Sequence, residues 1–112
     1  MSTDIELITE AEAAEFLGIG PIGVQQLIGD GSLVVLPIEG TRHGIPADFI
    51  QDGQVVKHLR AVITLLRDGR YTDAEVVDWL FREEESLPGS PIQALRENRG
   101  TEVKRRAQAA GF

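Results

Sequence analysis

Two neighbouring glutamines, Gln25 and Gln26, are the side chains in this sequence whose type and spacing most clearly suit recognition chemistry. A glutamine amide can donate to and accept from the N6 and N7 edge of adenine in the major groove of duplex DNA. Val24, Leu27 and Ile28 recur around them at helical spacing and form an apolar stripe, so both amides point away from the core. The remaining outward positions of this segment are Gly20, Ile22, Gly23 and Gly29. The segment is therefore predicted to be a helix with one apolar face and one outward face, whose two amides would suit base edges if the chain binds DNA.

A second polar group follows at Thr41, Arg42 and His43. It lies between the β-prone run Leu33–Leu36 and the segment Gly44-Ile45-Pro46, and two short strands joined by such a turn form a hairpin. The proline has no N–H for a ladder, so it ends the second strand. The sequence predicts a β-hairpin wing whose tip carries these three side chains.

Catalysis and cofactor binding fit the sequence poorly. It contains no cysteine, and no nucleophile, base and orienting acid combine into a catalytic set. Gly18-Ile19-Gly20-Pro21-Ile22-Gly23 spells a dinucleotide fingerprint, but that motif must follow a strand, and here a helix precedes it. His43 and His58 have no carboxylate at metal-ligand spacing. We expect no enzyme, no metal and no cofactor.

The net charge of −7 is distributed unevenly. No Lys or Arg precedes Arg42, whereas seven acidic residues do, and from Arg42 onward eleven basic and eleven acidic residues cancel. Contacts to phosphate must then come from Arg42, and from Lys57, Arg60 or Lys104-Arg105-Arg106 if the C-terminal region lies alongside the groove. No apolar run reaches the roughly 18 residues of a membrane span, and Met1-Ser2-Thr3-Asp4 lacks a basic signal region, so a cytoplasmic protein is expected.

Helix signals in the first half of the chain are local and specific. Thr9 and Glu12 form a capping box, and Gly18 suits a left-handed helix end. Pro21 suits the first turn of the next helix. The core face of the first helix is expected to hold Ala13, Ala14, Phe16 and Leu17, with Ile19 filling the space between the two helices.

The second half of the chain is expected to be helical. Apolar residues recur at three- and four-residue steps from Gln54 to Leu66, and a second capping box spans Thr72 to Glu75. Ser90 and Thr101 are candidate caps for two further helices. Trp79 and Phe81 are expected to make core or dimer contacts. The fold class is mainly α with a small β-hairpin wing: a winged helix-turn-helix over 1–50 and a C-terminal helical region over 51–112.

The first of these regions resembles the excisionase and MerR-like winged-helix family. The resemblance rests on Glu12-Ala13-Ala14, Leu17-Gly18-Ile19, and Val24 with Leu27-Ile28 before Gly31-Ser32-Leu33, and it covers roughly residues 7–50. It implies that the second helix reads duplex DNA, and it favours a DNA-binding transcriptional regulator. A homodimer on two half-sites is a reasonable hypothesis for so small a module.

Two further resemblances concern the rest of the chain. Gly53–Lys57, Leu66–Asp73 and Trp79-Leu80-Phe81 look like a small actinobacterial family of winged-helix DNA-binding proteins of the kinase-substrate regulator type. Pro91–Leu95 is similar to the toxin-binding C-terminal region of Xre-type antitoxins. The second resemblance implies the alternative: an antitoxin-like or adaptor protein whose C-terminal helices bind a protein partner.

Overall fold

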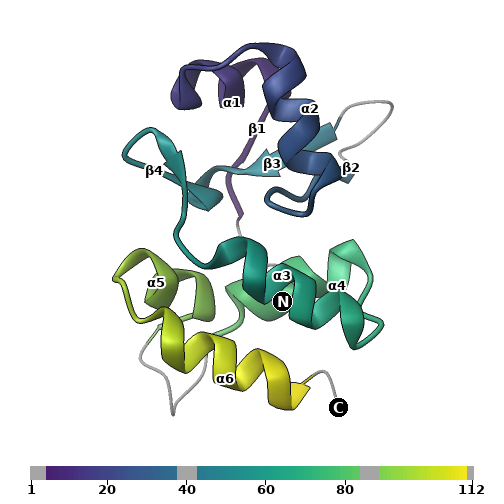
Figure 1. The fold of residues 1–112 in the computed structure, drawn as a ribbon, viewed down its shortest axis with the longest axis vertical. Coiled ribbons are helices and arrows are strands. Elements are labelled where there is room, and N and C mark those ends of the chain that lie inside the picture. The colour runs from purple at the N-terminus through teal and green to yellow at the C-terminus, as the bar shows by residue number, and fades with distance from the viewer. Residues whose placement is uncertain (1–4, 38–42, 84–88, 111–112) are drawn as a thin grey trace. The chain divides into compact units, whose positions relative to one another are not determined.

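The computed structural model describes residues 5–37, 43–83 and 89–110 (Figure 1). The chain forms two compact units, Met1–Val55 and Val56–Phe112. They are called unit 1 and unit 2 below, and each is described by itself. The division falls after Val55, whereas the sequence analysis places it after residue 50. Among the described residues, no helix is long and apolar enough to cross a membrane.

Unit 1 consists of two helices with short strands around them. Its elements are β1 (Leu7–Ile8), α1 (Glu10–Leu17), α2 (Pro21–Gly29), β2 (Leu36–Pro37), β3 (His43–Pro46), the 3-10 helix η1 (Ala47–Phe49), β4 (Ile50–Gln51) and β5 (Gln54–Val55). One antiparallel sheet has the order β1-β3-β2, with Ile8 opposite Ile45 and Leu36 opposite Gly44. A separate hairpin pairs β4 with β5. Two helices followed by the β2–β3 hairpin form a winged helix-turn-helix, which confirms the expected fold class.

The predicted caps position α1 and α2. Thr9 Oγ1 accepts from the Glu12 amide at 3.0 Å, and the Glu12 carboxylate accepts from the Thr9 amide at 2.9 Å. Gly18 ends α1 with φ of 67°, a conformation that glycine adopts without strain. Pro21 opens α2 as predicted. Ala14 is buried on α1 and Val24 on α2, so small side chains line the packed faces of the two helices.

One sequence-based expectation for this unit is wrong at the side-chain level. Phe16 was placed in the core but is 59% exposed. Ile19, expected to fill the space between the helices, lies against Gly23 of α2 and is 39% exposed. The exposed Phe16 follows the buried Ala13 and Ala14 on a helix of only two turns. Such a short helix buries a narrow face, and the two alanines occupy it.

The strand predictions need three corrections. Strand β2 covers Leu36–Pro37, so Leu33 and Val34 are buried without belonging to a strand. Strand β3 begins at His43, which was expected in the turn. The helix predicted from Gln54 begins only at Leu59, because Gln54–Val55 pairs with Ile50–Gln51 as a hairpin. Pairing with β4 therefore makes residues 54–55 a strand, although the spacing of their apolar residues also fits a helix.

Unit 2 contains four helices: α3 (Leu59–Asp68), α4 (Asp73–Phe81), α5 (Pro91–Arg96) and α6 (Gly100–Ala110). Helices α3 and α6 pack together and run in the same direction (Figure 1). The core is aliphatic and includes Leu59, Val62, Ile63, Leu66, Val76, Leu80, Ile92, Leu95 and Val103. The Thr72 capping box and the Ser90 cap are present as predicted. Thr101 is not the cap of α6, since that helix already begins at Gly100.

Candidate nucleic-acid interface

The exposed face of α2 is a continuous stripe. Ile22, Gln25, Gln26 and Gly29 are all exposed and follow one another at three- and four-residue steps, which places them on one side of a helix. Ile22 is 76% exposed, the largest exposed fraction among the bulky apolar side chains of the described chain. Val24 is fully buried on the opposite side. The arrangement resembles a reading helix: its anchored side is apolar, and its free side carries one aliphatic group and two amides.

The two glutamines of this stripe differ in their surroundings. The Gln25 side-chain amide donates to the Glu10 carboxylate on α1. The Gln26 side-chain amide has no hydrogen-bond partner within the described part of the chain. Gln26 is therefore available to a ligand as it stands, whereas Gln25 must first release Glu10.

Gly20 and Gly23, at the start of α2, have different structural roles. Gly20 is the N-cap of α2, and a Cβ there would meet nothing within 4 Å. At Gly23 a Cβ would lie 3.0 Å from Ile19 Cδ1, so this half-buried glycine serves the packing of the turn. Of the two, Gly20 is the one left open toward an approaching backbone.

The predicted wing-tip contacts can be placed only in part. Thr41 and Arg42 lie outside the described residues, and His43 is placed by its backbone as the first residue of β3, paired with Pro37. The β2–β3 hairpin that would carry them is present. The β-hairpin is thus present as expected, and the contacts of its tip side chains stay a prediction.

Electrostatics divides the two units. Unit 1 has nine acidic residues and one basic residue, Arg42, whereas unit 2 has nine acidic and ten basic residues. The Glu10 carboxylate lies next to the α2 stripe through its bond to Gln25. The exposed stripe of α2 therefore lies in a negatively charged environment, which repels phosphate.

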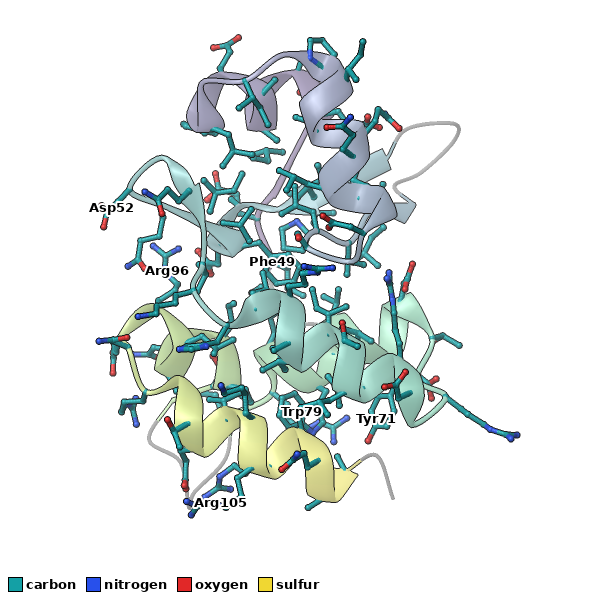
Figure 2. All side chains as sticks on the ribbon, in the orientation of Figure 1. Phe49, Asp52, Tyr71, Trp79, Arg96 and Arg105 are labelled. Carbon is teal, nitrogen blue, oxygen red and sulfur yellow. The ribbon has the colours of Figure 1, made fainter. Side chains whose placement is uncertain are left out.

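Most arginines of unit 2 are held in ion pairs. The pairs are Arg67–Asp73, Arg82–Asp78, Arg99–Glu97, Arg105–Glu102 and Arg106–Glu102. The proposed basic run Lys104-Arg105-Arg106 is thus partly neutralised by one carboxylate. Figure 2 shows Arg105 projecting outward from α6, where its side chain is 75% exposed at 3.7 Å from Glu102.

His58 marks a basic location that the sequence analysis missed. It was expected on a helix surface, but it is the N-cap of α3, with φ of 70°. Its imidazole touches the start of α6, since a Cβ on Gly100 would lie 2.4 Å from His58 Cδ2. Partial burial lowers the pKa of His58, and the charges of Lys104 and Lys57 lower it further. Only the packing of α3 on α6 brings these residues together, so no local sequence signal could reveal them.

Comparison with known proteins agrees with this architecture. Residues 56–111, which correspond to unit 2, match the family model described as the Rv2175c C-terminal domain of unknown function. The DNA-binding protein Rv2175c of Mycobacterium tuberculosis is 37% identical over 111 residues, covering 88% of this chain and 76% of that protein. The NMR structure of Rv2175c superposes with a TM-score of 0.88 at 34% identity, over 100% of this chain and 85% of that one. The chain belongs to the Rv2175c family, a small actinobacterial family that includes a DNA-binding protein.

Proposed function

We propose that this chain is a cytoplasmic DNA-binding transcriptional regulator, which acts by binding rather than by catalysis and places α2 in the major groove. The observation that carries this proposal is the exposed stripe Ile22, Gln25, Gln26 and Gly29 on the second helix of a helix-turn-helix. The name of the Mycobacterium tuberculosis relative, a DNA-binding protein, supports it.

The chemistry of the stripe favours A·T base pairs. The free amide of Gln26 matches the adenine N6 and N7 edge, and the exposed Ile22 side chain suits the thymine C5-methyl group. Gly29 and Gly20 leave room for the backbone of α2 to approach the groove closely. A preferred site is therefore expected to contain adenine and thymine where α2 lies.

One α2 helix reads few base pairs, and unit 1 has Arg42 as its one cation. We therefore propose that two copies bind two half-sites about one helical turn, or roughly 34 Å, apart. The hairpin tip, with Thr41, Arg42 and His43, would contact the phosphates beside each half-site.

Selection of bound sequences from a pool of random duplexes tests the proposal. A recurring A·T-containing motif is expected, and replacing both Gln25 and Gln26 with alanine should weaken the preference by about 1–3 kcal/mol per lost bidentate contact. Gln108→Ala is the matched control, because Gln108 is an exposed glutamine on α6 in unit 2. Full discrimination by the double variant would show that these residues do not read bases.

The second candidate function is protein binding through the C-terminal helices, as in antitoxins or adaptors. A shallow depression lined by Trp79, Pro91, Arg106 and Ala109 favours it. The antitoxin-like segment itself offers little surface, since Pro91, Ile92, Ala94 and Leu95 are all buried in unit 2. Failure to bind any duplex at low salt would favour this candidate over DNA binding.

A further inference from the structure

Specific DNA binding requires cations near the phosphates, and unit 1 supplies almost none. Arg42 is its single Lys or Arg, against nine carboxylates. Phosphate contacts generally dominate the affinity of DNA-binding proteins. If α2 reads bases, most of the phosphate contacts must be made by unit 2, whose family model carries no assigned function.

Few cations of unit 2 are free for such contacts. Five arginines are held in ion pairs with Asp73, Asp78, Glu97 and Glu102. Lys57, Lys104 and Arg70 have no such partner within the described chain. Arg70 lies just beyond the C-terminal end of α3, whereas Lys57 lies just before its N-terminal end. At 1.5 Å per residue, the ten-residue helix separates them by about 15 Å or more.

Lys57 and Lys104 meet around His58. Lys57 is its chain neighbour, and Gly100 at the start of α6 touches the His58 imidazole. Lys104 is one turn further along α6, at the four-residue spacing that places it on the same face as Gly100. The charges of both lysines act on His58, which lowers its pKa. The side chains of Lys57 and Lys104, which have no ion-pair partner within the described chain, are thus both associated with His58.

The surroundings of this surface, defined by Lys57, His58 and Lys104, add to its positive potential. No acidic residue occupies the first turn of α3, and the His58 side chain makes no capping hydrogen bond there. The Glu102 carboxylate on α6 is already engaged by Arg105 and Arg106. Lys57 is also the second residue of unit 2, so the surface lies next along the chain to the unit that carries α2.

We propose that the surface formed by Lys57, His58 and Lys104 contacts the phosphates of the DNA whose bases α2 reads, an inference that rests on the proposed function. Lysine is a compact charge suited to phosphate oxygens, and it makes no demand on base sequence. The family's C-terminal domain would then provide affinity, and the helix-turn-helix would provide sequence preference.

Binding of the full chain to its selected duplex at several salt concentrations tests this division. The double variant Lys57→Gln with Lys104→Gln should reduce the slope of log K against log salt by about two units, at about 0.9 per phosphate contact. Affinity at moderate salt should fall on the order of tenfold, while the ratio between the selected and a scrambled duplex should stay unchanged. Arg70→Gln is the control: it removes one unpaired charge from unit 2 at the opposite end of α3, and it should leave the slope unchanged.

The outcomes separate the two proposals. If the wild type binds the selected duplex and the double variant keeps the wild-type slope, the phosphate surface is overturned and base reading by α2 stands. If Arg70→Gln reduces the slope by as much per removed charge as the double variant does, the phosphate surface is also overturned, since only net charge would then matter. If the wild type binds no duplex at low salt, both proposals fail. Amide spectra of the variants must match the wild type away from the substituted positions, which excludes loss of folding.

Discussion

Units 1 and 2 differ in what they can offer DNA. Unit 1 exposes the stripe Ile22, Gln25, Gln26 and Gly29 on α2 but carries nine acidic residues and one basic residue, whereas unit 2 carries nine acidic and ten basic residues. A net charge of −7 taken over the whole chain therefore conceals two opposite contributions. The ability of this chain to bind a polyanion therefore depends on the charge of each unit and on the cations that are not held in ion pairs, rather than on the net charge of the whole chain.

The largest effect is expected from a cavity in the core of unit 2. Leu66 is fully buried on α3, and Leu66→Ala should lower the free energy of unfolding by about 2–5 kcal/mol. If the units are separate compact bodies, amide exchange should accelerate first in α3 to α6 and less in α1 and α2. Equal acceleration in both units would break the comparison, because the chain would then unfold as one body.

The two capping boxes allow matched variants in the two units. Thr9→Ala and Thr72→Ala each remove a side-chain acceptor at the start of a helix, and each should cost about 1 kcal/mol of unfolding free energy. Thr9→Ala should also weaken sequence preference, because α1 supports α2, whereas Thr72→Ala should leave that preference unchanged. Thermal melts and duplex competition measure both effects. An equal loss of preference in the two variants would contradict the division of roles.

The acidic surroundings of α2 predict a gain of affinity. Glu10→Gln removes the carboxylate bonded to Gln25 and should tighten DNA binding two- to threefold, about 0.5 kcal/mol, within the range of exposed charge interactions. The exposed Glu15 near the end of α1 provides the control variant Glu15→Gln, with a smaller gain expected. Weaker binding by Glu10→Gln would instead mean that Glu10 positions Gln25 for reading.

The smallest effect concerns pH. The pKa of His58 is lowered in the folded state, so the unfolded chain binds more protons as pH falls through 6.5. Stability that is present above pH 6.5 is therefore lost as pH falls toward the lowered pKa. His58→Asn removes the titrating imidazole and should therefore reduce this dependence of stability between pH 7.5 and 5.5. The variant should still fold, since asparagine tolerates the positive φ of this position. Melting temperatures across this window provide the check; an unchanged profile in the variant would assign the effect to other groups.

Local signals explain what the sequence could predict. The capping boxes at Thr9 and Thr72, the left-handed Gly18 and the first-turn Pro21 each determine a helix end within a few residues, and all four are present. The β4–β5 hairpin was missed although Asp52-Gly53 is a known hairpin turn signal, because the following residues also fit helical spacing. Residues 54–55 form a strand because they pair with β4, and the periodicity of apolar residues contains no information about such pairing.

Side-chain environment was harder to predict than element type. The periodicity of α1 suggested that Phe16 is buried, but burial depends on what packs against a two-turn helix, and this phenylalanine is exposed. Of the positions predicted to face outward on α2, Ile22, Gln25, Gln26 and Gly29 are exposed, whereas Gly23 is half-buried against Ile19. The surface around His58 could not be predicted, since it joins residues 57 and 104 only through the packing of α3 on α6.

Chemical-shift mapping of the full chain with its selected duplex tests the central claim most directly, because each amide reports on its own unit. The account predicts the largest shifts at Ile22, Gln25, Gln26 and Gly29 on α2, and a second set at Lys57, His58 and Lys104 that weakens as salt is raised. Shifts confined to α4 and α5, with α2 unperturbed at saturation, would contradict it and show that this family member does not read DNA through its helix-turn-helix.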